Sequence, residues 1–323
     1  MKKINYIVLV FTVLFTSCKN EDWAFPDYDY QTVYFGTQYP VRTITFGEDL
    51  FDTSLDNEGK FQIMATVGGV YDNKKDISID VEVDNSLSQN LLFGQGGTDI
   101  VTMPSNYYQL ASNKIVIPKG SLVGGVQVQL TDAFFADPLS ASRTFVIPLR
   151  AKNVTNADSI LKGKDFTLYA VKYVNEWHGF YLRRGKDIIE GKNGNTSLNK
   201  IVTRRNQYVE RDEVKALTTK ARRVVEMPLV FQDGGGTNFS SNLLLSFDNN
   251  NNCTVSAASN QFTATGTGRL VKKGEKNSWG EKDRDVVYVD YVIDHPIMKI
   301  TSTDTLVLRN RGVVMEVFEP VSK

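Results

Sequence analysis

The sequence predicts an all-β fold, and two observations support that prediction. Short stretches of alternating apolar and polar residues recur along most of the chain, and Gly, Asn, Asp and Pro separate them. This is the pattern of half-buried strands joined by turns, whereas the 3.6-residue period of an amphipathic helix is almost absent. The roughly 300 residues that follow the first apolar segment suit two domains better than one.

The start of the chain predicts an export signal. Two lysines precede an apolar run from Ile4 to Phe15, which is shorter than the roughly 20 residues that a membrane-spanning helix needs. Two small residues then lead into Cys18, and this arrangement resembles the lipobox of bacterial lipoproteins. The resemblance implies that residues 1–17 form a lipoprotein signal peptide and that Cys18 is lipidated. The alternative is an ordinary signal peptide followed by a chance cysteine.

Residues 18–30 form the predicted lipidated tether. Lys19, Glu21 and Asp22 follow the cysteine and resemble the export signal that sends lipoproteins of the Bacteroidota to the outer face of the outer membrane. The resemblance implies a lipid-anchored protein on the cell surface, held at the membrane through its N-terminal lipid. The alternative is a solvated polar tether that carries no export signal.

Residues 31–173 are expected to form the first domain. Seven short alternating stretches separated by turn signals predict a β-sandwich of immunoglobulin-like type, although no Cys-Trp-Cys core is present. The predicted strands are Thr32–Gly36, Arg42–Gly47, Lys60–Gly69, Ile77–Asp84, Lys114–Gly120, Gly125–Asp132 and Thr144–Ala151.

Residues 174–323 are expected to form the second domain, with the boundary near Val174. Its alternating stretches are longer and are joined by tight turns, which favours a closed or nearly closed antiparallel β-barrel of lipocalin-like form. The predicted strands are Trp177–Gly185, Arg222–Phe231, Asn242–Asp248, Asn252–Ala257, Phe262–Gly274, Asp285–Asp294, Ile297–Gly312 and Val313–Phe318.

Both halves resemble domains of a surface-lipoprotein family of the Bacteroidota. Ser105–Pro138, with its Tyr107/Tyr108 pair and the strand ending at Ile117–Gly120, resembles an N-terminal sandwich domain of unknown function. The same kind of domain precedes family 18 endo-β-N-acetylglucosaminidases. The later stretches "SWGEKDRDVVYVDY" and "DTLVLRNRGVVMEVF" resemble the uncharacterised barrel-like domain that accompanies it.

The resemblance implies a role but supplies no binding residue. Proteins of this layout are commonly associated with Sus-like glycan-uptake systems, which implies a non-catalytic surface protein that binds a glycan or glycoprotein and contacts an outer-membrane transporter. The alternative is a structural or adhesive accessory lipoprotein that contacts a protein partner. A glycoside hydrolase has the least support, because the DxxDxDxE signature of family 18 is missing.

The sequence offers little catalytic chemistry, so we expect no enzyme. His178 and His295 belong to no pattern of metal-ligand spacing. The acidic groups Glu210–Glu213 and Glu281–Asp285 include basic neighbours in turn-rich stretches, whereas a glycosidase needs two carboxylates about 5 to 9 Å apart with one of them protonated. Nucleotide-binding loops and a nucleophilic serine motif are absent.

Cofactors, metals and nucleic acid find no clear support either. Once Cys18 is lipidated, Cys253 has no cysteine partner, which excludes a disulfide framework. The turns Asp233–Asn238 and Asp248–Asn252 could offer oxygen ligands to Ca²⁺, but both suit hairpin turns. With 37 basic and 37 acidic residues, the net charge of zero gives no reason to expect a nucleic acid partner.

Aromatic residues are the remaining candidates for binding, because the CH-rich face of a sugar packs on a Trp or Tyr ring. Trp279 lies in a polar loop and is the best single candidate, with Asn277 as a hydrogen-bond donor. Tyr288 and Tyr291 are candidate neighbours, although their odd spacing places them on opposite faces of a regular strand. Trp177 fits better as a core plug at one end of the barrel.

Overall fold

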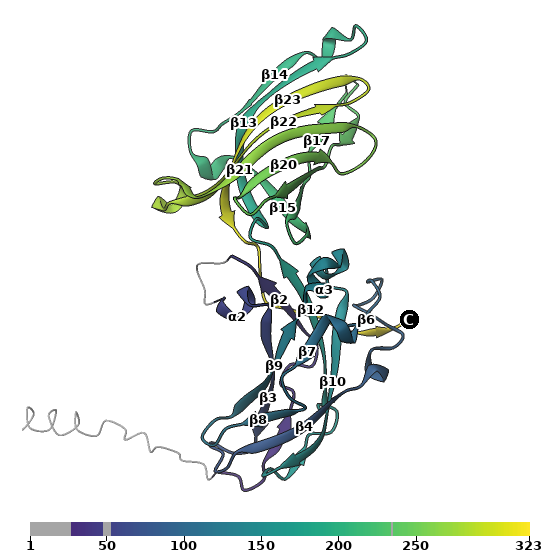
Figure 1. Ribbon diagram of the computed structural model, residues 1–323, viewed down its shortest axis with the longest axis vertical. Helices are drawn as coiled ribbons and strands as arrows, with labels where there is room; N and C mark the ends of the chain where they lie inside the picture. The colour runs from purple at the N-terminus through teal and green to yellow at the C-terminus, as the bar shows by residue number, and fades with distance from the viewer. Residues whose placement is uncertain (1–26, 48–52, 234) are drawn as a thin grey trace, which may run out of the picture.

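A computed structural model describes residues 27–47, 53–233 and 235–323. These residues form two all-β domains stacked along the longest axis of the molecule, with the barrel above the sandwich in Figure 1. The predicted fold class is therefore confirmed. The predicted signal peptide and the lipidation site at Cys18 lie outside the described residues.

The first domain is built from one long sheet that folds over its own core. The strand order is β11-β1-β3-β9-β8-β4-β10-β12-β2-β24, with β6 paired to β10 and β7 paired to β9. Its strands before the junction are β1 (Thr32–Tyr34), β2 (Pro40–Thr45), β3 (Lys60–Gly68), β4 (Ile77–Val83), β6 (Val101–Thr102), β7 (Tyr108–Leu110), β8 (Lys114–Ile117), β9 (Val123–Leu130), β10 (Phe145–Thr155), β11 (Ser159–Ile160) and β12 (Phe166–Val174).

Short helical turns and one further strand connect these elements. They are α2 (Ser54–Asn57), η1 (Asn85–Ser88), β5 (Leu91–Leu92), η2 (Ser105–Tyr107), α3 (Asp132–Ala136) and η3 (Pro138–Ala141). Asp84 and Asp137 accept hydrogen bonds from the backbone N–H of Ser86 and Leu139, respectively, and so cap the two 3₁₀ turns that follow them.

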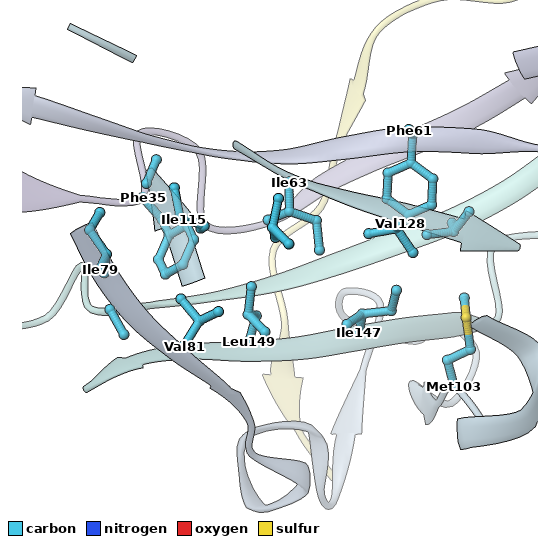
Figure 2. Packing of buried hydrophobic residues seen from close by; sticks show 14 of the residues in the cluster. Phe35, Phe61, Ile63, Ile79, Val81, Met103, Ile115, Val128, Ile147 and Leu149 are labelled. Carbon is cyan, nitrogen blue, oxygen red and sulfur yellow. The ribbon is translucent and has the colours of Figure 1, made fainter. Parts of the chain in front are cut away.

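The sandwich core follows from the alternation of the strands. In β3 every second residue from Phe61 to Val67 is buried, and Phe61 and Ile63 point toward Ile147 and Leu149 of β10 (Figure 2). Successive side chains of a strand point to opposite faces, so this alternation places one face in the core and the other in water. Each such side chain contributes roughly 1.5–3 kcal/mol when fully buried.

The second domain is a closed barrel of eight antiparallel strands. Closure occurs because β23 pairs with β13 along nearly its whole length, from Phe180 opposite Asn310 to Gly191 opposite Met298. The strands and turns are β13 (Gly179–Gly191), η4 (Thr196–Leu198), β14 (Lys200–Arg204), η5 (Val209–Arg211), β15 (Glu213–Ala221), β16 (Val224–Met227), β17 (Val230–Gln232), β18 (Asn238–Ser240), β19 (Leu243–Phe247), β20 (Asn252–Ala257), β21 (Thr263–Glu275), η6 (Trp279–Glu281), β22 (Arg284–Asp294) and β23 (Met298–Asn310).

Strand β13 changes partner halfway along its length. Its first half, Gly179 to Arg183, pairs with β15, and its second half, Gly185 to Ile189, pairs with β14. A Cβ atom at Gly185 would lie 2.1 Å from the carbonyl oxygen of Thr303, so only glycine fits where the change occurs. The alternation in the sequence predicts no strand at either β14 or β15.

The C-terminal segment differs from the prediction. The sequence placed Val313–Phe318 in the barrel, but the chain leaves the barrel after β23 and returns to the sandwich (Figure 1). There β24 (Glu316–Val317) pairs with β2, and β25 (Val321–Ser322) pairs with β5. The alternating pattern predicts a strand but does not identify its partner, which is why the sheet was assigned wrongly.

One aromatic residue fixes this returning segment. Phe318 is buried in a cluster with Phe93 and Val146, and its ring centroid lies 4.9 Å from that of Phe93 and 5.7 Å from that of Tyr39. The backbone N–H of Phe318 also donates to the carbonyl of Tyr39 at 3.0 Å. The C-terminal residues are therefore part of the first domain's second, smaller core.

We predict that Phe318→Ala lowers the free energy of unfolding by about 3–5 kcal/mol, because it removes a buried ring and leaves a cavity. Phe318 is 4% exposed, whereas nearby Met315 is 96% exposed. Met315→Ala is therefore the matched control, with an expected change within ~0.5 kcal/mol. Urea unfolding of the full chain measures both. Equal stability of the two variants would mean that the tail does not stabilise the sandwich.

Candidate functional site

The interior of the barrel is filled by side chains. Trp177 lies 2% exposed and stacks on Phe247, with ring centroids 4.5 Å apart and an interplanar angle of 6°. Its indole N–H donates to Asn251 at 3.3 Å. The interpretation of Trp177 as a core plug is confirmed. Since the buried cluster around it draws on nearly every barrel strand, the core occupies the space where lipocalin-like barrels of larger bore hold a ligand.

A buried ionic cluster lies on the inner wall beside this core. Asp304 of β23 accepts from Arg183 Nε at 2.8 Å, from Arg204 at 2.5 Å and from the hydroxyl of Tyr291 at 2.7 Å. Arg204 also pairs with Asp187, which accepts from the hydroxyl of Ser302 at 2.6 Å. Buried charges are stable only when paired and hydrogen-bonded in this way. The cluster therefore holds β13, β14 and β23 together.

The position of Tyr291 corrects one expectation for the carbohydrate site. Tyr291 points into the barrel and is 2% exposed, and its burial raises the pKa of its hydroxyl far above the ordinary value. It cannot share a surface site with Trp279. Tyr288, three positions earlier, lies on the outer wall and donates to Glu275 at 2.8 Å, as the odd spacing predicts.

Trp279 folds back onto the outer wall of the barrel. Its indole N–H donates to the carbonyl of Leu308 at 3.1 Å, and the guanidinium carbon of Arg284 lies 3.8 Å from the centre of its ring. The ring packs on an outer apolar cluster of Leu182, Val286 and Val307, which Tyr288 also contacts. The structure thus brings Trp279 and Tyr288 to one cluster, with one ring face of Trp279 occupied by Arg284.

Asn277 lies exposed at the turn of the same loop, with a φ of +45°. Its backbone N–H donates to Asp283 Oδ1 at 3.1 Å, and Lys276 pairs with the same carboxylate at 2.9 Å. Asp283 therefore holds the loop from β21 to β22 in one shape, and Asn277 remains a candidate donor at its surface. Whether Trp279, Asn277 and Tyr288 bind carbohydrate stays a prediction.

A cavity with a volume of about 830 Å³ lies between the two domains. Residues of β2 and α2, with Gly47 and Thr53 next to them, form one side, including Arg42, Thr45 and Asp56. Barrel residues of the β21–β22 loop and the end of β23 form the other side. They are Lys273, Lys282, Asp283, Arg284, Asp285, Leu308, Arg309, Asn310, Arg311 and Gly312, and the crossing residues Val313 and Val314 follow them. We call this cavity the interdomain cleft.

Charge in the interdomain cleft is mixed and partly unpaired. Arg42 pairs with Asp56, which also accepts from the backbone N–H of Thr45 at 2.8 Å, and burial raises the pKa of Asp56. In contrast, Arg309 and Lys282 are exposed, and neither forms an ion pair with any residue that the structure describes. The sequence does not predict this cleft, because its two walls come from segments more than 200 residues apart and share no local motif.

The two turns considered for Ca²⁺ and the buried Cys253 have structural roles. Asp233 accepts from the backbone N–H of Gly235 and Thr237, and Asp248 accepts from those of Asn250 and Asn252, so both close their own turns. Burial raises the pKa of the Cys253 thiol to about 12, which leaves it unreactive at neutral pH.

The described part of the chain shows neither a candidate metal cluster nor a candidate membrane-spanning helix. Residues 27–47, 53–233 and 235–323 contain no group of three His, Cys, Asp or Glu side chains that could hold a metal ion. Within the same ranges, every helix is too short or too polar to span a membrane.

Two family models and a solved structure from Bacteroides ovatus are similar to this chain. A family model described as a domain of unknown function, DUF5627, matches residues 176–312, and a second model described as an N-terminal domain matches residues 28–158. The chain is therefore a two-domain all-β protein with a DUF5627 domain. It belongs to the same family as a Bacteroides ovatus protein of unknown function, with 42% identity, a TM-score of 0.86 and coverage of 92% of this chain and 100% of that one.

Two more distant structures match the chain with lower scores. One is a Bacteroides ovatus multidomain protein including DUF1735, with 12% identity, a TM-score of 0.45 and coverage of 86% of this chain and 94% of that one. The other is an auxiliary nutrient binding protein from Bacteroides thetaiotaomicron, with 12% identity, a TM-score of 0.42 and coverage of 83% and 90%. No curated protein matches the chain. Likenesses this remote carry no conclusion about function.

His178, at the start of the barrel, gives the stability of the fold a pH dependence. His178 Nδ1 accepts from the backbone N–H of Thr219 at 3.1 Å, and burial, with Arg311 and Lys172 nearby, lowers the pKa of His178 from 6.5 to about 4. The folded protein thus binds the proton more weakly than the unfolded chain does. This contribution to stability is fully present above pH 6.5 and is lost as the pH falls toward 4.

We predict that His178→Asn flattens the stability profile between pH 6.5 and pH 4, because the amide oxygen of asparagine lies where Nδ1 accepts from the Thr219 N–H but does not titrate in this range. A single shifted group contributes a slope of up to about 1.4 kcal/mol per pH unit. Urea unfolding midpoints of both proteins across this range measure the difference. Parallel profiles would show that His178 is not desolvated.

Proposed function

We propose that the protein is a non-catalytic, glycan-binding lipoprotein of the cell surface and that the interdomain cleft is its binding site. The observation that carries this proposal is the composition of the cleft. Guanidinium, ammonium and carboxylate groups all line a volume of about 830 Å³. A sugar hydroxyl both donates and accepts hydrogen bonds, so a ligand with many hydroxyls suits such a lining better than a ligand of one charge.

Apolar groups at the cleft support the same proposal. Val313, Val314 and Leu308 line it beside the charged residues, and they offer surface to the CH groups of a sugar ring. Trp279 lies outside this lining but covers Arg284 by a cation–π contact at 3.8 Å. In this proposal Trp279 positions the Arg284 guanidinium, and its ring need not contact the sugar.

The N-terminal sequence supports a proposed location at the cell surface. We propose that Cys18 carries the lipid and that the protein faces outward from the outer membrane, as the resemblance to Bacteroidota lipoproteins implies. A glycan held in the cleft could then be passed to a transporter in the same membrane. The 42% identical protein comes from Bacteroides ovatus, and such an anchor is expected in this group of bacteria.

A second candidate function rests on one edge of the sandwich. Strand β24 ends the sheet order, and Met315 and Val317 are exposed at this edge. An exposed apolar edge strand can pair with a strand of another chain. This feature favours the alternative of an accessory lipoprotein that contacts a protein partner.

A glycan array followed by calorimetry tests the cleft. We predict binding by the soluble chain from residue 19 and a loss of about 10-fold to 100-fold in affinity for Arg309→Ala, because hydrogen bonds to charged groups contribute about 1.5–3 kcal/mol. Lys299→Ala is the matched control, since Lys299 is an exposed cation on the same strand but outside the cleft. An array without hits at millimolar sensitivity would favour the accessory function.

Cell fractionation and surface proteolysis test the proposed lipid anchor and outward display. We predict that Cys18→Ala moves the protein from the outer-membrane fraction to the soluble fraction, because each buried acyl CH₂ contributes about 0.8 kcal/mol to membrane affinity. We also expect protease added to intact cells to cleave the unmutated protein. Membrane retention of the variant would overturn the lipid anchor, and protection from protease would overturn outward display.

A further inference from the structure

A hollow of about 490 Å³ lies on the sandwich where the described chain begins. Tyr28, Tyr30 and Tyr34 line it, together with Gly68, Gly69 and Lys164. The start of the described chain lies at the lower end of the sandwich in Figure 1, opposite the barrel. This tyrosine hollow is therefore separate from the interdomain cleft and from the loop of Trp279.

The aromatic rings of the hollow are accessible. Tyr28 is 75% exposed and Tyr30 is 59% exposed, and neither hydroxyl forms a hydrogen bond with a residue that the structure describes. The Tyr34 ring lies against Gly68, because a Cβ atom added there would meet Tyr34 Cε1 at 3.2 Å. A side chain at Gly68 would push this ring away, so glycine leaves the Tyr34 ring in place beside the other two.

Contacts of Asp27 and Gly69 fix the backbone that carries Tyr28 and Tyr30. The carboxylate of Asp27 accepts from the backbone N–H of Tyr28 at 2.9 Å and from that of Tyr71 at 2.8 Å. Gly69 has a φ of +95°, and a Cβ atom there would lie 2.2 Å from the carbonyl oxygen of Tyr30. Rigid, large tyrosine side chains on a fixed backbone lose little entropy when they bind a ligand.

We propose that the tyrosine hollow is a second carbohydrate-binding site and that it takes a neutral oligosaccharide. This inference rests on the proposed function as a glycan-binding protein and adds a second site to it. The faces of tyrosine rings pack on the CH faces of sugar rings. Polar groups at the hollow complete the site: Lys164 lies 5.7 Å from the centre of the Tyr34 ring, and its ammonium group can donate to sugar oxygens.

One cation, Lys164, lines the hollow, and the two carboxylates that flank its tyrosines in the sequence outweigh that charge. Asp27 and Asp29 alternate with Tyr28 and Tyr30 in the sequence, and Asp29 is exposed without an ion pair or hydrogen bond to any described residue. Carboxylates accept hydrogen bonds from sugar hydroxyls and repel sulfates, uronates and phosphates. The same charges oppose an anionic lipid surface and a nucleic acid.

Calorimetry with defined probes tests the second site. The probes are neutral malto-, cello-, xylo- and manno-oligosaccharides, polygalacturonate as an anionic glycan, and vesicles of phosphatidylethanolamine and phosphatidylglycerol. We expect the soluble chain from residue 19 to bind a neutral probe at two sites, and Tyr28→Ala/Tyr30→Ala to lower the affinity of one site about 10-fold to 100-fold and leave the other unchanged. Tyr28→Phe, which keeps the ring, should bind with little change.

Tyr208→Ala is the matched control, because Tyr208 is an exposed tyrosine on the barrel, and it should bind as the unmutated protein does. Loss of binding in Arg309→Ala but not in the double tyrosine variant would overturn the second site and leave the proposed function standing. Failure of the unmutated protein to bind any probe would overturn both. Tyrosine-dependent binding of polygalacturonate or of vesicles in place of the neutral probes would overturn the class of ligand.

Discussion

The guanidinium of Arg311 ties together the two points at which the chain passes between the domains. It donates to the carbonyl of Asn175 in the first crossing at 2.7 Å and to that of Phe46, at the end of the sandwich, at 3.0 Å. Arg311 is itself buried at the start of the second crossing. A buried charge is costly unless it finds such acceptors, so the three segments are stable only when they meet. The shape of the interdomain cleft depends on this contact.

A second contact limits the relative motion of the domains on another side. Arg222, in the turn between β15 and β16, pairs with Asp132 of α3 at 2.9 Å and lies over the ring of Phe135 at 5.3 Å. The exposed ion pair contributes little alone, but it acts with the Arg311 contact and with the C-terminal strands β24 and β25. Three separate ties make a preformed cleft, and a preformed site loses less entropy on binding.

Strands with an apolar inner face could be predicted from the sequence, and strands with a polar inner face could not. The alternation of β21, β22 and β23 follows the prediction closely, and it also placed Tyr288 and Tyr291 on opposite faces of β22. Strands β14 and β15 were missed because Arg204, Glu213 and Lys215 point to the ionic cluster, so they lack the expected apolar residues. The cleft and the tyrosine hollow were missed because each joins distant segments.

The proposed anchor gives the two proposed sites different distances from the membrane. Asp27 is only nine positions after Cys18, so a fully extended tether keeps the tyrosine hollow within about 32 Å of the lipid. The barrel lies at the opposite end of the sandwich from the start of the described chain (Figure 1), and barrel residues form one wall of the interdomain cleft. A long glycan that reaches both sites binds the second one at a high effective concentration, so two weak sites give a stronger combined affinity. A short oligosaccharide gains nothing from the second site, and the arrangement therefore favours polymeric glycans.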